Sequence, residues 1–138
     1  MNSQLDSLKF EKHTDTKGNE VEILPTIIQD YQTGQVLVLC YMNREALRLT
    51  VQTGKVHMYS RSRGRVALKG ESSGHFQLVK EILADCDKDT VIFKVEQHSA
   101  ACHEGYYSCF YRQYDFSGSE WKIIGEKIFD PAAVYKKK

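Results

Sequence analysis

The stretch 21-VEILPTIIQDYQTGQVLVLCY-41 decides the fold, because it holds two β-favouring runs on either side of a short polar segment. Residues 21–28 and 35–41 are rich in Val, Ile and Leu, of which the β-branched residues favour strands. The intervening 29-QDYQTG-34 is mostly polar and ends on glycine, which is typical of a turn. We therefore expect a β-hairpin here.

Two helices are expected outside this hairpin. Asn43 can cap a helix over residues 44–52, which Gly54 can end. Ser73 can cap a second helix, over residues 75–83, because the apolar residues of that segment recur at a spacing of three to four.

The remaining segments favour strands. These are residues 56–61, 66–69 and 91–97, and a second hairpin formed by 106–116 and 120–124. The sequence thus predicts an α+β fold that is dominated by β-structure, with a mainly antiparallel sheet or barrel-like core and two or three short helices.

Length and composition indicate one globular domain, residues 1–138. Hydrophobic residues make up 41% and charged residues 27%, and the net charge is +1. This balance gives no electrostatic case for nucleic-acid or membrane partners. Neither a membrane-spanning run nor a signal peptide is evident, so we expect a cytoplasmic protein with reduced cysteines.

The segment 85-DCDKDT-90 contains three carboxylates, Asp85, Asp87 and Asp89. In an extended segment they would point to one side, and their mutual repulsion favours a hard cation such as Mg²⁺ or Ca²⁺. The spacing also fits an EF-hand loop. Thr90, however, stands where that loop needs glycine, and a strand is expected where the second helix should follow.

Three cysteines, Cys86, Cys102 and Cys109, have no C-x-x-C spacing, so a zinc finger or ribbon is excluded. Three thiolates on one zinc ion would leave the fourth position open to water, as in catalytic sites. Small buried cysteines that only pack are the alternative. His103 and His75 are the candidate general bases beside such a site.

Cationic and hydroxyl side chains suggest that an anion is bound nearby. A basic block over residues 55–70 precedes an acidic block over 71–104. Guanidinium, ammonium and hydroxyl groups match phosphate oxygens, and the helix expected at His75 would aim free N–H groups at an anion. The candidate substrate-binding residues are Arg61, Arg63, Lys69, Ser72 and Ser73.

Together these motifs resemble the phosphoribosyl-AMP cyclohydrolase family, which acts in the third step of histidine biosynthesis. The resemblance covers about residues 35–112, in the family's order and spacing. The matching stretches are 41-YMNREAL-47, 60-SRSR-63, 69-KGESSGH-75, 85-DCDKDT-90, 101-ACHEG-105 and 108-SCF-110.

The resemblance implies a function and a ligand set. The family's zinc ligands match Cys86, Cys102 and Cys109, and its Mg²⁺ ligands match Asp85, Asp87 and Asp89. The implied reaction is hydrolysis of the N1–C6 bond of the adenine ring of 1-(5-phosphoribosyl)-AMP. The family also implies an intertwined homodimer whose zinc sites are built from both chains, and the chain length suggests a monofunctional enzyme.

Two other readings compete with this one. A zinc nucleobase deaminase would carry H-x-E followed by P-C-x-x-C, and the sequence has neither. A non-enzymatic module, stapled as a dimer by metal or binding calcium, would bind its ion without turnover.

Overall fold

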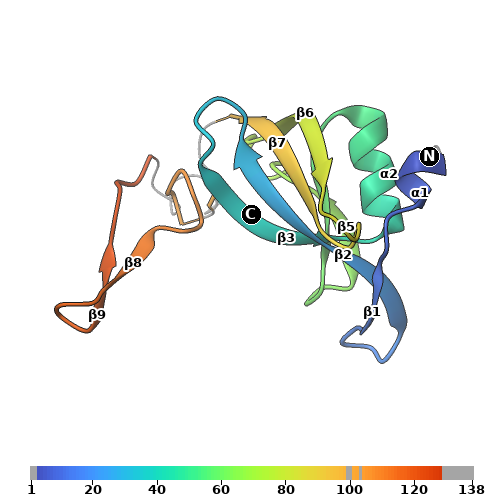
Figure 1. The fold of residues 1–138 in the computed structure, drawn as a ribbon, viewed down its shortest axis with the longest axis horizontal. Helices are drawn as coiled ribbons and strands as arrows, with labels where there is room; N and C mark the ends of the chain where they lie inside the picture. Colours follow the sequence, from blue (N-terminus) through green and yellow to red (C-terminus); the bar gives the residue numbers. More distant parts are fainter. Residues whose placement is uncertain (1–2, 99–100, 103, 129–138) are drawn as a thin grey trace.

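The computed structural model describes residues 3–98, 101–102 and 104–128 (Figure 1). Strands dominate this part of the chain, as predicted. Its helices are α1 (Ser3–Asp6) and α2 (Arg44–Thr53). Its strands are β1 (Glu11–Thr14), β2 (Glu20–Asp30), β3 (Val36–Met42), β4 (His57–Ser60), β5 (Arg65–Leu68), β6 (Gln77–Ala84), β7 (Val91–Gln97), β8 (Arg112–Asp115) and β9 (Glu120–Ile123). No helix in the described ranges is long and apolar enough to cross a bilayer.

The main sheet is built around β2. Strand β3 pairs antiparallel with β2, which confirms the hairpin expected over residues 21–41. Strand β7 pairs parallel with β2, β6 pairs antiparallel with β7, and β1 pairs antiparallel with the start of β2. The sheet is therefore mainly antiparallel, as predicted, with one parallel pair, β2 and β7. Strands β4 and β5, and β8 and β9, form separate two-stranded sheets.

Helix α2 begins and ends where the sequence predicted. The Asn43 side chain accepts a hydrogen bond from the Ala46 N–H at 2.8 Å, which satisfies one free donor of the first turn. Gly54 closes the helix in the left-handed conformation, with φ 76°, and its N–H donates to the Thr50 carbonyl at 2.9 Å.

The prediction of a helix over residues 75–83 is wrong, and the predicted role of Ser73 as its N-cap is therefore wrong as well. The segment is strand β6. A bulge at Lys80 explains the misleading spacing: Val79 pairs with Val95 and Glu81 with Lys94, so Lys80 is an extra residue. This shift in the alternation places apolar residues three apart, which imitates a helical period.

The core lies between the main sheet, helix α2 and the β4–β5 pair. Its largest fully buried side chains include Phe93, Leu24, Ile28 and Leu37. Helix α2 contributes Ala46 and Leu47 to this core and contacts β3, β4 and β5.

The β8–β9 hairpin extends away from the main sheet as an arm (Figure 1). Its apolar side chains are strongly exposed, with Phe116 at 89% and Trp121 at 66%. The hairpin was predicted, but its first strand is shorter than residues 106–116. The chain just before β8 is instead bonded to β3, through the Cys109 N–H and the Leu37 carbonyl at 2.7 Å.

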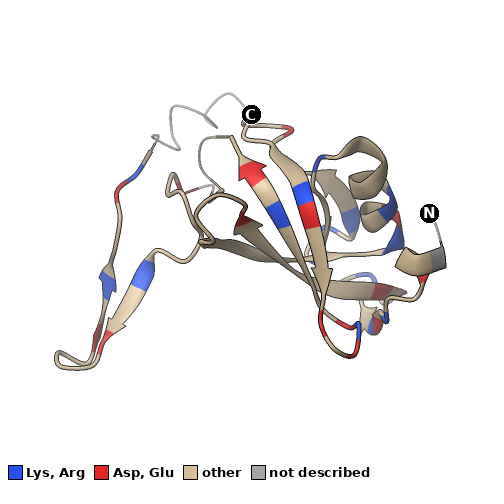
Figure 2. Cartoon of the chain, turned by 45° about the horizontal axis from the view of Figure 1, so that its top comes forward, with Lys and Arg blue, Asp and Glu red and all other residues tan. Residues whose placement is uncertain are grey.

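Charges of both signs lie along β6 and β7 (Figure 2). The Lys94 Nζ lies 3.7 Å from the Glu81 Oε1 across these strands. Because both side chains are substantially exposed, this ion pair contributes little to stability.

Candidate active site

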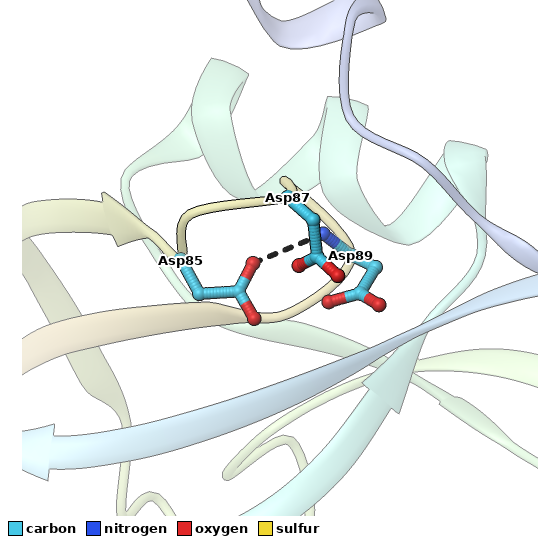
Figure 3. A group of neighbouring side chains, drawn as sticks. All are labelled: Asp85, Asp87 and Asp89. Carbon is cyan, nitrogen blue, oxygen red and sulfur yellow. Dashed lines mark hydrogen bonds between the residues drawn. The ribbon is translucent and has the colours of Figure 1, made fainter.

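The tight turn between β6 and β7 gathers the carboxylates of Asp85, Asp87 and Asp89. One oxygen of each lies within 4.8 Å of the others (Figure 3). The turn is closed by the Asp89 N–H, which donates to Asp85 Oδ1 at 3.1 Å, and by Lys88 in the left-handed region with φ 63°. The carboxylates therefore converge on a turn, and not along the extended segment that we expected.

Because these carboxylates lie close together, the pKa values of two of them shift in opposite directions. Hydrogen bonding between Asp87 and Asp89 lowers the pKa of Asp87 and raises the pKa of Asp89. A bound cation would relieve the repulsion between these carboxylates. Because strands flank the turn on both sides, it is not an EF-hand loop.

A compact loop before β8 holds Cys102 and Cys109. The Ala101 N–H donates to the Tyr107 carbonyl at 2.9 Å, and the Cys102 N–H donates to the Tyr106 carbonyl at 3.1 Å. Cys102 is buried at 4% exposure, and Cys109 is fixed by the hydrogen bond from its N–H to the Leu37 carbonyl. Burial, and to a lesser extent Cys102, raises the pKa of Cys109 to about 12. A cation would have to offset this cost before both thiols could ionise.

Cys86 does not join these two thiols within one chain. It follows β6, whose last residue Ala84 pairs with Val91 at the start of β7. Cys109 is bonded instead to Leu37, near the start of β3, on the other side of β2 from β7. Because strand β2 lies between β3 and β7, these two inter-strand spacings alone span about 10 Å. Among the described residues, the Asp85, Asp87 and Asp89 group is the one set of three or more potential ligands that converges.

Lys69 lies next to the Cys102–Cys109 loop. Its Nζ donates a hydrogen bond to the Ala101 carbonyl at 2.6 Å. Burial lowers the pKa of Lys69, and the nearby thiols of Cys109, Cys102 and Cys40 oppose this shift. Lys69 therefore sits among thiols, a placement that the sequence pattern did not reveal.

The other candidate substrate-binding residues occupy two different loops. Ser72 and Ser73 belong to the loop after Lys69, where the Ser73 Oγ accepts a hydrogen bond from the His75 N–H at 3.2 Å. Arg61 and Arg63 are exposed on the β4–β5 turn, and the Arg61 guanidinium carbon lies 4.1 Å from the centre of the Tyr41 ring. An anion site at a helix N-terminus is excluded here, because no helix begins at His75.

Of the two candidate general bases, His75 and His103, the structure describes only His75. His75 is partly buried in the loop between Lys69 and β6. His103 lies outside the described residues.

The contact between Asp30 and Tyr107 was not predicted from the sequence. The Tyr107 hydroxyl donates to the Asp30 carboxylate, which also accepts hydrogen bonds from the N–H groups of Gln32 and Thr33. Asp at the start of a turn was a signal for the local bonds. The link to Tyr107 crosses from one hairpin to a distant loop, and no local pattern indicates it.

Comparisons with known proteins agree with the motifs. The family model for phosphoribosyl-AMP cyclohydrolase matches residues 38–111. A phosphoribosyl-AMP cyclohydrolase of Pelotomaculum thermopropionicum is 53% identical over 134 residues, 97% of this chain and 97% of the relative. One of Methanothermobacter thermautotrophicus is 53% identical over 119 residues, 85% of each chain. The histidine biosynthesis bifunctional protein HisIE of Thermoanaerobacter pseudethanolicus is 49% identical over 136 residues, 99% of this chain and 58% of the relative.

A carboxylate triad and a thiol pair on a β-dominated scaffold, together with these relatives, define the chain as an enzyme of the hydrolase class. It belongs to the phosphoribosyl-AMP cyclohydrolase family.

Proposed function

We propose that the chain catalyses the zinc-dependent hydrolysis of the N1–C6 bond of the adenine ring of 1-(5-phosphoribosyl)-AMP. The product is the ring-opened phosphoribosyl-formimino-AICAR phosphate, in the third step of histidine biosynthesis. The observation that carries this proposal is the family match over residues 38–111, which includes every proposed metal ligand.

The donor chemistry of the thiol loop supports zinc. Zinc prefers thiolates, and Cys102 and Cys109 lie on one compact loop held by backbone hydrogen bonds. Cys86 of a second copy would supply the third ligand, because Cys86 of the same chain follows β6, which β7 and β2 separate from β3. The proposed zinc site therefore requires two chains.

Exposed apolar side chains near both half-sites favour such a homodimer. Ile82 and Leu83, just before the Cys86 turn, are 39% and 42% exposed. Phe116 and Trp121 project from the arm that follows Cys109. Apolar surface of this extent is typical of a protein–protein interface. An arm that crosses to a second copy would cover it and give an intertwined dimer.

When bound, zinc would supply a Lewis acid that activates water for attack on C6. Ribosylation at N1 makes this carbon electron-poor. The side chains then have distinct tasks: His103 or His75 accepts and returns protons during addition and ring opening. Free thiols suit a reducing compartment, so we place the reaction in the cytoplasm.

The carboxylate triad and the cationic loops would bind the substrate's charged groups. Asp85, Asp87 and Asp89 offer oxygen ligands of the kind that Mg²⁺ prefers, and Mg²⁺ there can orient a phosphate. Arg61, Arg63, Lys69, Ser72 and Ser73 remain candidates for the two phosphates of the substrate.

The test is a metal analysis of purified protein combined with turnover of phosphoribosyl-AMP, followed by the absorbance change on ring opening. We expect Cys86→Ala, Cys102→Ala and Cys109→Ala each to lose zinc and turnover. Cys40→Ala tests whether the remaining thiol, which lies within strand β3 and near Lys69, takes part, and it should retain zinc. Thr53→Ala, on the exposed side of helix α2, is the control. Full turnover in the three ligand variants would contradict the proposal, as would metal binding without any turnover by the wild type.

Two histidine variants test the proton-transfer role. His75→Asn and His103→Asn should each be compared with the wild type for zinc content and turnover. We expect the true base to lose turnover by about 100-fold or more while zinc content is kept. Wild-type turnover in both variants would remove histidine from the mechanism.

A further inference from the structure

Lys69, one of the candidate substrate-binding residues, donates a side-chain hydrogen bond to the loop that holds Cys102 and Cys109 (the thiol loop). It follows β5, and its N–H donates to the Val56 carbonyl at 2.9 Å, which fixes its backbone. Its Nζ reaches the Ala101 carbonyl at 2.6 Å. Ala101 is 1% exposed and directly precedes Cys102. The ammonium group therefore holds the chain at the residue next to a proposed zinc ligand.

The charge of this ammonium group has no carboxylate partner among the described residues, where none of the ion pairs includes Lys69. A cation removed from water is costly unless an opposite charge lies close to it. The groups that act on the Lys69 charge are the thiols of Cys109, Cys102 and Cys40. The hydrogen bond to the Ala101 carbonyl places this positive charge one residue from Cys102, on the loop that would carry two of the thiolate ligands.

Metal binding at this loop would bring a negative charge close to the ammonium group. Three thiolates and one Zn²⁺ ion carry a net charge of about −1, and one ammonium group brings the total close to zero. A phosphate ligand would need an ammonium group free to leave the Ala101 carbonyl. The observed hydrogen bond and the surrounding thiols favour the first role over the second.

We propose that Lys69 is a positioning residue that balances the charge of the thiolate metal site and fixes the Cys102 side of the loop, and that it does not bind a substrate phosphate. The inference rests on the proposed function, since it assumes that Cys102 and Cys109 ligate zinc. It assigns the phosphates to the remaining candidates, among them Arg61 on the exposed β4–β5 turn.

Zinc affinity of the full-length protein, measured by competition with a chelating chromophore, tests this role without substrate. Lys69→Met keeps the aliphatic stem and removes the charge. Lys69→Gln keeps a hydrogen-bond donor without the charge, and Lys69→Arg keeps the charge. We expect about 10- to 100-fold weaker zinc binding in the Met and Gln variants. Lys69→Arg should remain within a few-fold of the wild type.

Lys55→Met is the matched control, because Lys55 is also partly buried but lies over the Phe76 ring, 4.5 Å from its centre. It should bind zinc as the wild type does. Thermal melting of the metal-free variants reports whether each one folds, and the Gln and Arg pair keeps the comparison meaningful if the Met variant does not.

Steady-state kinetics at saturating zinc separates the two roles of Lys69. A positioning role predicts a lower kcat with KM nearly unchanged. Unchanged zinc affinity in all three Lys69 variants, with a raised KM, would overturn the inference in favour of phosphate binding. Equal weakening in the Gln, Met and Arg variants would also overturn it, because charge would then not be the cause. A wild type that binds no zinc at its cysteines would instead refute the proposed function, and this inference with it.

Discussion

The Tyr107 hydroxyl donates a hydrogen bond to the carboxylate of Asp30, which joins the loop between Cys102 and Cys109 to the end of β2. Asp30 is 7% exposed, and the bond itself is partly buried. It anchors the Cys109 side of the loop, as Lys69 anchors the Cys102 side.

Tyr107→Phe removes this bond and keeps the ring. We expect it to lower the free energy of unfolding by about 1–3 kcal/mol, because a buried carboxylate loses one donor. Urea denaturation of the metal-free protein measures the change. Tyr31→Phe serves as control, since Tyr31 is 48% exposed and should change stability very little. Equal free energies of unfolding for wild type and Tyr107→Phe would show that this hydrogen bond does not stabilise the fold.

Asp30 also predicts a pH dependence of stability. Burial alone would raise its pKa, but the hydrogen bonds from Tyr107, Thr33 and Gln32 outweigh burial and lower the pKa below its usual value. A lowered pKa in the folded state stabilises the protein above the pKa of the unfolded chain, about 3.9, and this contribution is lost as the pH falls through the folded value. Comparing wild type with Asp30→Asn by denaturation should show a gap that narrows below about pH 4. A gap that stays constant down to pH 2 would contradict the assignment.

The carboxylate triad predicts stabilisation by Mg²⁺. A cation that binds only the folded state should raise its free energy of unfolding, by about 2.7 kcal/mol at a concentration 100 times the Kd. Asp87→Asn should abolish this Mg²⁺-dependent rise in Tm, and in the absence of Mg²⁺ it should not destabilise the protein, because it relieves repulsion. Asp6→Asn, on exposed helix α1, should leave the Mg²⁺ effect intact. Persistence of the effect in Asp87→Asn would place the cation elsewhere.

We expect position 70, in the loop that carries Ser72, Ser73 and His75, to require glycine. Its φ is 92°, and a Cβ there would lie 2.7 Å from the His75 carbonyl carbon. Gly18 has a similar φ of 84° with nothing within 4 Å, so it isolates the cost of backbone strain. We expect Gly18→Ala to cost about 1 kcal/mol and Gly70→Ala to cost about 2 kcal/mol or more. Equal costs in thermal denaturation would remove the steric argument.

Local features of the chain were predictable from sequence. The two apolar runs around Asp30 specified the β2–β3 hairpin, and Asn43 and Gly54 specified the ends of α2. Each signal acts between residues that are close in the chain. Strand β6 was misread because the bulge at Lys80 breaks the two-residue alternation that identifies strands.

The arrangement of the candidate site was only partly predictable. The spacing of Asp85, Asp87 and Asp89 indicated a cluster, and the cluster is present because one turn holds all three. The position of Lys69 beside Cys102 and Cys109 depends on a contact between segments 32 residues apart, between Lys69 and Ala101. The separation of Cys86 from the other two thiols follows from the pairing of β7 with β2 and β6, which no spacing reveals.

The central claim is that one metal site takes Cys86 from one chain and Cys102 and Cys109 from another. Mixing two inactive variants, Cys86→Ala and Cys102→Ala, tests it most directly when subunits are unfolded together and refolded with zinc. Half of the refolded dimers would then be mixed, and each would hold one intact site of two, so turnover should recover to about one quarter of wild type. Each variant refolded alone should remain inactive. No recovery in the mixture, from protein that has refolded into dimers, would contradict a site shared between chains.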